Sequence, residues 1–384
     1  PRPAPWGYVK VPGSWRSQEG GEILDARADK PVTKWDEVSV SHYSAAWLER
    51  DFAWSAAPAA GAGVFLVCES VYDACDFYLN DVPLGTGRAG AAQGAAVFDV
   101  TDIIRAGAPN RLSVLAGRPY GDYRYLNHEG KIVWMLSGMR GSVYLETHPS
   151  RHLALSEVFA IPSYRGKRLG VEFLVSNGDG WSGELSARCE VEEVGSGRRH
   201  DLGEASCRLS GEAQERVAVS FAWADPVLWF PDDPRLLNLH LSVLRAGRLA
   251  DAPPPVRFGF REVWTDGGDL VMNGVPFRVR GSGNGWDSGG AGVRGLIDFY
   301  LARGMNSAIG WFLDATPQPT LGEALRVADE TGFLSAFNIY MPGGSEASRR
   351  EQLRNTLNNF RNHPCVYGYV IGSEPYCVGY MNDP

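Results

Sequence analysis

Residues 296–311 read LIDFYLARGMNSAIGW, and this stretch decides how the C-terminal third of the chain is expected to fold. The apolar side chains of residues 296–303 recur at the spacing of a helix, and Gly304 is typical of a helix C-terminus. Residues 307–311 then form a short apolar run that is typical of a buried strand. A helix that leads through a glycine into a strand is one step of a βα repeat.

The same alternation continues on both sides of this stretch. A capping box at residues 320–323 opens a second helix that Gly332 ends. An apolar stripe at Leu353, Leu357 and Phe360 predicts a third helix. Further strands are predicted at residues 277–280, 333–339 and 366–371. Four parallel strands in about 120 residues predict the first half of a (β/α)8 TIM barrel, which typically takes about 250 residues.

Upstream, short β-branched and aromatic runs alternate with turn residues. Between residues 61 and 117 they recur every 10–15 residues, including a turn at Asn80-Asp81, which is typical of an antiparallel sandwich. A second series, from residue 153 to 243, fits one immunoglobulin-like β-sandwich that the prolines at 253–255 end. We therefore expect a multidomain chain, β then α/β, with domains at residues 1–149, 150–256 and 257–384.

Composition excludes several classes of protein. The 384 residues carry 45 acidic and 37 basic side chains, a formal charge of −8 without a basic block, which disfavours nucleic acid. No apolar run approaches the ~20 residues of a membrane helix, so we expect no membrane partner. The six cysteines lack zinc-site spacing, so no metal is implied. They could be free thiols or pair as Cys68 with Cys75 and Cys189 with Cys207.

The chain ends also carry expectations. The sequence begins at Pro1 without a signal segment, so either a leader has been removed or the chain starts internally. A secreted or periplasmic location is favoured over a cytoplasmic one. The sequence stops at Pro384, in the middle of the expected barrel, so we expect the remainder of the barrel to come from a missing C-terminal part. A homo-oligomer is left open.

Candidate site residues follow the four predicted parallel strands, because reactive groups of a βα barrel lie at the C-terminal ends of its strands. Carboxylates mixed with aromatic rings and an amide suit a sugar, whose C–H faces stack on rings and whose hydroxyls need polar partners. We expect a carbohydrate substrate, such as an oligosaccharide or glycoside. The candidates are Trp286, Asp287, Trp311, Asp314, Asn338, Tyr340, Ser373, Glu374 and Tyr376.

Glu374 is the most informative of these. It follows the apolar strand at residues 366–371, and Pro375 biases it towards an extended backbone, so its side chain is expected at the barrel rim. It could instead be a solvated rim carboxylate or the partner of a structural arginine. Asp287 and Asp314 could each simply cap a following helix.

The tryptophans have similar alternatives. Trp286 and Trp311 could line a pocket or fill the space between barrel and sandwich. We expect core or interface positions for a further set, Trp6, Trp15, Trp47, Trp54, Trp181 and Trp223. The sequence contains none of the motifs GxSxG, HExxH and GxxxxGK[ST], which are typical of serine hydrolases, zinc metalloproteases and phosphate-binding loops. The glycines at 281–285 lack the following helix that a dinucleotide site requires.

Several segments together resemble glycoside hydrolase family 2, the β-galactosidase, β-glucuronidase and β-mannosidase group. The segments and the family patterns that they resemble are residues 9–15 (VPGxW), 78–85 with 98–104 (LNGxxLG…DVT), 229–234 (WxPxxP), 257–262 with 272–277 and 280–281 (RFGFRE…LNGxPxxLRG), and 362–366 with Glu374 (NHPSV…NE). The resemblance spans the whole chain. It implies that the first domain is a sugar-binding-like jelly roll and that no redox cofactor is used.

The resemblance also implies roles. Glu374 matches the family's general acid/base, and the chain would be part of a retaining, exo-acting glycosidase. Ser373 stands where the family has an asparagine that binds the substrate 2-hydroxyl, so the family's sugar preference does not carry over. The nucleophilic glutamate comes from a later barrel strand, and no residue here corresponds to it. We therefore expect this chain alone to be inactive.

Two alternatives come from other classes of protein. A non-catalytic carbohydrate-binding protein on the same scaffold would account for Ser373 and for the missing second carboxylate. A purely structural multi-sandwich module is disfavoured, because a βα repeat would then have no reason to gather aromatic and acidic residues at its strand ends.

Overall fold

The computed structural model describes residues 45–55, 57–118, 141–282, 292–309, 321–339 and 360–371, with shorter pieces at 11, 22–25, 30–34, 125–126, 132–133, 138–139, 346, 350, 353–354 and 357–358. Antiparallel sheets form the N-terminal two thirds, and a parallel sheet follows them. Two small ribbons pair β1 (Glu22–Asp25) with β2 (Lys30–Lys34), and β7 (Tyr125–Leu126) with β8 (Ile132–Val133).

The first large sheet is built around one long hairpin. Its strands are β3 (Ala46–Ala53), β4 (Gly63–Leu79), β5 (Val82–Asp99), β6 (Pro109–Arg118), β9 (Gly138–Met139) and β10 (Val143–His148). β10 pairs with the first half of β4 and β6 with the second half, so the sheet curls around its own apolar core. The turn at Asn80-Asp81 has φ angles of 54° and 68°, as a two-residue hairpin of type I′ requires.

The length of β4 differs from the sequence prediction. Separate strands were expected at residues 64–67 and 76–79, but both lie in β4. The register of its pairing with β5 shifts between Cys68 and Asp73. This irregularity moves the core-facing side chains from even positions such as Leu66 to odd positions such as Phe77, and both are buried. The alternation is therefore interrupted although the strand continues.

The second sandwich packs two antiparallel sheets over one core. One sheet has the order β11 (Leu153–Ser163), β12 (Arg168–Asn177), β15 (Gln214–Ala222). The other has β14 (Arg199–Leu209), β13 (Gly183–Glu193), β16 (Leu237–Arg245) and β17 (Arg248–Asp251), with β18 (Val256–Phe258) also on β16. β16 alternates buried and partly buried residues, as its sequence predicts. Cys189 and Cys207, on β13 and β14, are free thiols.

A small antiparallel sheet links this sandwich to the parallel part. It contains β19 (Val263–Asp266), β20 (Asp269–Met272) and β21 (Val275–Phe277). The prediction of a parallel strand at residues 277–280 is wrong: Phe277 ends β21, and the parallel sheet begins at β22 (Gly281–Ser282). The apolar run at 275–277 pairs locally because Asn273-Gly274, with φ angles of 47° and 81°, makes a tight hairpin turn.

The parallel sheet confirms the βα repeat. Its order is β22, β23 (Ser307–Ile309), β24 (Leu334–Ile339) and β25 (Val366–Ile371), and every neighbouring pair is parallel. α1 (Gly292–Leu301) and α3 (Leu321–Thr331) lie between these strands in the chain. Leu353, Leu357 and Phe360 are helical, and they pack against the core that the helices share with the sheet.

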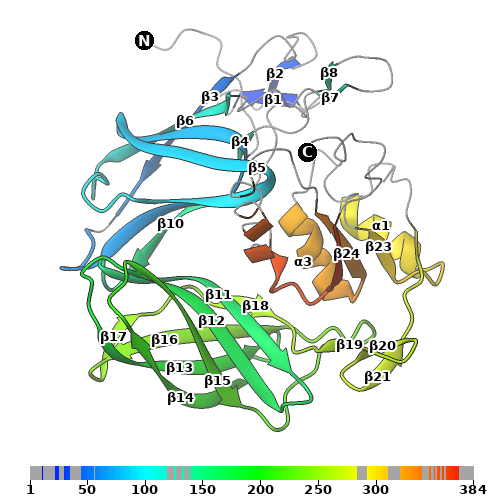
Figure 1. Cartoon of the computed structure of the whole chain (residues 1–384). Helices are drawn as coiled ribbons and strands as arrows, with labels where there is room; N and C mark the ends of the chain where they lie inside the picture. The colour runs from blue at the N-terminus through cyan, green and yellow to red at the C-terminus, as the bar shows by residue number, and fades with distance from the viewer. Residues whose placement is uncertain are drawn as a thin grey trace.

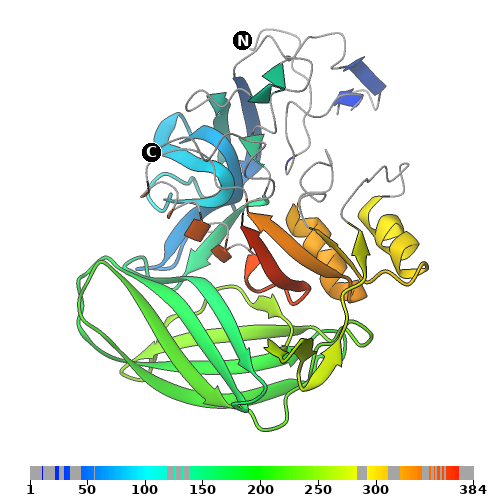
Figure 2. The ribbon, with the colours of Figure 1, turned by 45° about the vertical axis from the view of Figure 1, so that its right-hand side comes forward.

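Figures 1 and 2 show how the three parts are arranged. The second sandwich (green) lies at the base, and the first sheet (blue to cyan) and the parallel sheet (yellow to red) both lie above it. No helix among the described residues is long and apolar enough to cross a membrane.

The tryptophan predictions have different outcomes. Trp223 is buried, and Trp54 and Trp181 pack against cores, as expected. Trp6 and Trp15 lie outside the described residues. Trp47 contradicts the expectation, because 48% of it is exposed. Its neighbours on β3 turn towards the core, so the alternation of the strand directs Trp47 to the other face, where its ring contacts that of Tyr78 at 5.6 Å.

Candidate active site

The candidate residues follow the C-terminal ends of the parallel strands in the chain. β22, β23, β24 and β25 are mutually parallel, so their C-terminal ends share one edge of the sheet. Asn338 belongs to β24, and its backbone pairs with Val370 of β25. The other candidates lie outside the described residues: Trp286, Asp287, Trp311, Asp314, Tyr340, Ser373, Glu374 and Tyr376.

The opposite, N-terminal end of β25 is held by Arg261. This arginine lies between the second sandwich and the small linking sheet, in the segment that resembles the RFGFRE pattern. Its Nε donates to the carbonyl oxygen of Pro364 at 2.5 Å, and a second guanidinium nitrogen donates to the carbonyl oxygen of Val366. Burial lowers the pKa of Arg261. The planar guanidinium thus joins two backbone groups on either side of Cys365.

Asp329 of α3 holds the same segment from another side. One carboxylate oxygen accepts from the Cys365 backbone N–H at 3.1 Å, and the other lies 2.6 Å from Nδ1 of His363. Arg257 also reaches this carboxylate, at 3.4 Å. Only 2% of the Asp329 side chain is exposed, so these partners compensate for the burial of a charge.

The second sandwich contacts α3 directly through Trp229. This residue is fully buried, and its Nε1 donates to the backbone carbonyl oxygen of Asp329 at 3.0 Å. Gly259 lies against it: a Cβ atom at this glycine would come within 2.7 Å of Pro364 and 2.8 Å of Trp229. A glycine is required here because the backbone, the tryptophan ring and the loop before β25 meet at van der Waals distance.

The sequence analysis did not identify Asp329, which holds the segment before β25 in place. On a helix, an aspartate is usually expected on the solvated face. Its spacing carried the signal, because Asp329 follows buried Leu325 by four residues, which places both side chains on one face of the helix. The residues that resemble family patterns, such as Trp229, Arg261 and His363, converge on this part of the structure.

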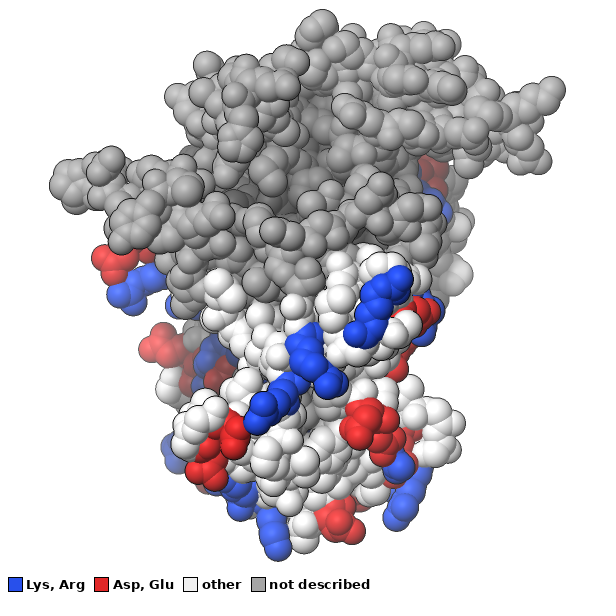
Figure 3. Space-filling model, turned by 90° about the vertical axis from the view of Figure 1, so that its right-hand side faces the viewer, with Lys and Arg blue, Asp and Glu red and all other residues white. Residues whose placement is uncertain are grey.

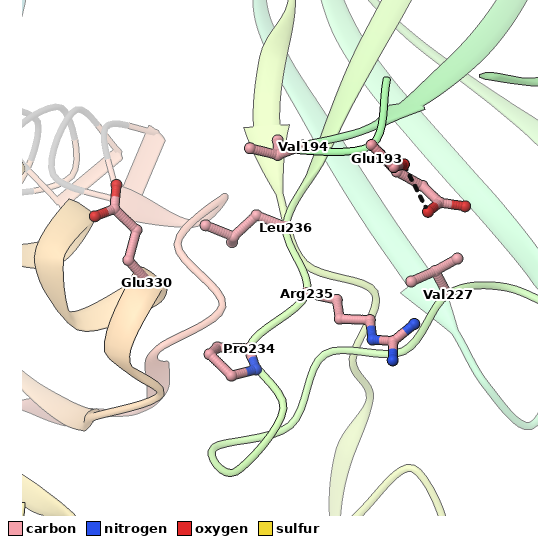
Figure 4. A pocket seen from close by; sticks show the side chains of 8 residues that line it. Glu193, Val194, Val227, Pro234, Arg235, Leu236 and Glu330 are labelled. Carbon is pink, nitrogen blue, oxygen red and sulfur yellow. Dashed lines mark hydrogen bonds between the residues drawn. The ribbon is translucent and has the colours of Figure 1, made fainter. Parts of the chain in front are cut away.

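A pocket of about 370 Å³ lies elsewhere, between the second sandwich and α3 (Figure 4). Its lining is mixed in charge and polarity: Glu193, Val194, Ser196, Val227, Pro234, Arg235, Leu236 and Glu330. None of these residues belongs to the parallel sheet or to the candidate set. The pocket is therefore separate from the strand edge on which the candidate chemistry depends.

The described surface carries charges of both signs. On the face that Figure 3 shows, the described basic and acidic side chains are interspersed. One ion pair bridges the two helices, from Arg294 of α1 to Glu330 of α3 at 3.2 Å. Among the described residues, no group of three or more His, Cys, Asp or Glu side chains is arranged to hold a metal ion.

Several antiparallel sheets, followed by one small parallel sheet with interspersed helices, define the class of fold to which the chain belongs. The chain is 27% identical over 287 residues to a β-galactosidase from Aeromonas hydrophila subsp. hydrophila, which covers 71% of this chain. No family model matches the chain.

Solved structures have the same fold. A glycosyl hydrolase family 2 member from Bacteroides cellulosilyticus superposes with a TM-score of 0.67 at 19% identity over 96% of this chain. A β-glucuronidase from Bifidobacterium dentium, complexed with coumarin-3-O-glucuronide, gives a TM-score of 0.64 at 20% identity over 97%. The chain is thus similar in fold to solved members of glycoside hydrolase family 2 and in sequence to β-galactosidases.

The chain spans only part of these relatives. It covers 27% of the Aeromonas β-galactosidase, 51% of the Bacteroides structure and 64% of the Bifidobacterium structure. The match therefore relates this chain to the N-terminal region of such proteins.

Proposed function

We propose that this chain is the N-terminal part of a retaining, exo-acting glycosidase and that Glu374 is its general acid/base. In this proposal the first domain is a jelly roll, the second an immunoglobulin-like sandwich and the third the first half of a (β/α)8 barrel, with boundaries near residues 149 and 256. The substrate is a carbohydrate.

The observation that carries the proposal is the run of chain from residue 362 to 374. Arg261 and Asp329 form hydrogen bonds with the segment before β25. β25 ends at Ile371, on the edge that the C-terminal ends of the parallel strands share. Glu374 follows that strand end three residues later in the sequence. Chain position and relationship to family 2 together support the assignment.

A retaining glycosidase works in two steps, and the proposed acid/base acts in both. Glu374, as the acid, donates its proton to the leaving oxygen while a second carboxylate attacks the sugar carbon. It then accepts a proton from the water that cleaves the glycosyl intermediate. The two carboxyl groups must lie about 5–5.5 Å apart. The sequence assigns no nucleophile within this chain, so we expect the 384 residues alone to turn over no glycoside at a normal rate.

The remaining candidates are proposed to bind the sugar. Rings can stack on the C–H faces of a pyranose, and carboxylate, amide and hydroxyl groups can bond its hydroxyls. These residues are Trp286, Asp287, Trp311, Asp314, Asn338, Tyr340, Ser373 and Tyr376.

Glu374→Gln in the full-length encoded protein tests the acid/base role. A panel of aryl glycosides first identifies the sugar, and the variant is then assayed with a 2,4-dinitrophenyl and a phenyl glycoside of that sugar. We expect a loss of about 10²–10⁴ in kcat/KM on the phenyl substrate and a much smaller loss on the dinitrophenyl substrate, whose leaving group needs no proton. Azide should restore turnover of the glycosyl intermediate.

Equal activity of variant and parent on the phenyl substrate would remove Glu374 from the mechanism. Retained sugar binding without any turnover in the parent protein would favour the second candidate, a non-catalytic carbohydrate-binding protein. Ser373, which stands where family 2 has an asparagine, is the feature that favours this alternative.

A further inference from the structure

Strand β11 of the second sandwich is interrupted at the place where it meets the parallel part of the molecule. Its pairing with β12 shifts register between Ser156 and Phe159, and Glu157 has a left-handed φ of 51°. β11 is also the outermost strand of its sheet among the described residues. A bulge at a sheet edge leaves backbone N–H and C=O groups without a ladder partner.

The side chain of Asn362 supplies that partner. The Ala160 backbone N–H donates to Oδ1 of Asn362 at 3.0 Å, and Nδ2 of Asn362 donates to the carbonyl oxygen of Val158 at 2.8 Å. The side-chain amide thus offers the acceptor and the donor that a peptide group of a neighbouring strand would offer. Asn362 lies four residues before β25, so this contact ties the approach to that strand to the sandwich.

Arg361 adds a second link to the same bulge. It donates to the backbone carbonyl oxygen of Glu157 at 2.9 Å and to Glu172 of β12 at 3.0 Å. Its guanidinium also lies 4.3 Å from the centre of the Phe159 ring. The Glu157 side chain accepts from Asn358 at 2.8 Å.

We infer that Asn362 and Arg361 are positioning residues, which use the bulge of β11 to set the placement of β25 and, through it, of Glu374. The second sandwich then takes part in the reaction indirectly, by fixing where the proton donor lies. This inference rests on the proposed acid/base role of Glu374. The inference also states that loss of the bulge contacts impairs proton donation to the leaving group more than it impairs the other steps of the reaction.

Asn362→Ala and Asn362→Asp test this in the full-length protein, with Asn177→Ala as the matched control. Asn177 also bonds backbone groups, at Trp181 and Glu212, but its contacts lie within the second sandwich. Asn177 is buried and Asn362 partly buried, so the control removes at least as much buried polar contact. Displacing a catalytic group by about 1 Å can cost about 10² in rate. We expect Asn362→Ala to lower kcat/KM about 10- to 100-fold more for the phenyl than for the dinitrophenyl glycoside.

Asn362→Asp keeps an acceptor for the Ala160 N–H but places a carboxylate oxygen against the carbonyl oxygen of Val158, so its effect should be of the same kind and at least as large. Loss of folded protein alone would lower activity equally on both substrates, which is the pattern expected for Asn177→Ala. Equal losses on both substrates in Asn362→Ala, beside unequal losses in Glu374→Gln, would overturn the positioning role alone. Equal losses in Glu374→Gln would overturn the acid/base role and the inference together.

Amide hydrogen exchange on the 384-residue chain gives a readout that needs no activity. Asn362→Ala should speed exchange of the Ala160 N–H and of the β25 amides about fivefold to tenfold, the effect of one lost hydrogen bond. Asn177→Ala should leave β25 unchanged. Unaltered exchange in β25 of Asn362→Ala would contradict the inference.

Discussion

Asp329 shows how one side chain can join several parts of this molecule. Its carboxylate binds the Cys365 N–H and His363 in the segment before β25, and Arg257 of β18. Its backbone carbonyl oxygen accepts from Trp229. The carboxylate is buried, so every partner that is removed leaves a polar atom without compensation.

We expect Asp329→Asn to lower the free energy of unfolding by about 3–5 kcal/mol, because it breaks a buried charge pair and places an amide N–H₂ opposite a donor. Glu330→Gln is the adjacent control. Glu330 pairs with Arg257 and Arg294 at the surface, where 43% of its side chain is exposed, and such pairs contribute about 0–1 kcal/mol. Urea unfolding followed by circular dichroism compares the two. Similar losses would show that the buried network is not what stabilises this junction.

The C-terminal ends of α1 and α3 share a local backbone conformation but differ in their tertiary contacts. Gly304 and Gly332 follow α1 and α3, and their φ angles of 74° and 70° confirm the left-handed C-terminal positions that the sequence predicts. Their surroundings differ. A Cβ at Gly304 would meet nothing within 4 Å, whereas one at Gly332 would lie 1.8 Å from the carbonyl oxygen of Pro231 in the second sandwich.

The pair Gly304→Ala and Gly332→Ala separates backbone strain from steric clash. Both variants place an alanine in the left-handed region, at a cost of about 1–2 kcal/mol. Gly332→Ala also requires Pro231 and the C-terminus of α3 to move apart, so its total loss should exceed that of Gly304→Ala by at least about 1 kcal/mol. Thermal unfolding measures both. A Gly332→Ala variant as stable as Gly304→Ala would mean that α3 and the sandwich can separate without cost.

At the scale of the whole molecule, a buried histidine connects the first sheet to the second sandwich. His148 ends β10, and its Nδ1 lies 2.9 Å from Asp251 of β17, while Nε2 lies 3.2 Å from Glu146. Asp251 also accepts from the Leu155 N–H of β11 at 2.7 Å. Burial lowers the pKa of His148, but the hydrogen bonds to Asp251 and Glu146 outweigh it and raise the pKa to about 9.

This histidine makes the stability of the chain depend on pH. Because its pKa is raised on folding, its contribution is complete below the unfolded value of about 6.5 and is lost as pH rises through about 9. At pH 7 the shift corresponds to about 2–3 kcal/mol. We expect the unfolding free energy of the parent to fall between pH 7 and 10, and that of His148→Gln to be lower at pH 7 and flatter over this range. Parallel pH curves for the two proteins would rule out His148 as the titrating group.

Much of the fold follows from local pattern. Alternation in β16, the helical stripe of α1 and the glycines at 304 and 332 each depend on neighbours in the chain, so the order of two antiparallel assemblies and a parallel βα sheet could be read before any contact was known. The resemblance to family 2 likewise rests on short local motifs. The identity of the acid/base as Glu374 remains a prediction from chain position and resemblance.

Other features depend on contacts between distant residues. The continuity of β4 through its register shifts, the exposure of Trp47 and the local pairing of Phe277 depend on which strands become neighbours. Asp329 meets His363, and Asn362 meets the bulge at Glu157, across 34 and more than 200 residues of chain. Local sequence sets periodicity and turns, whereas burial and hydrogen-bond partners are decided when the sandwich, α3 and β25 pack together, because only then are these polar groups removed from water.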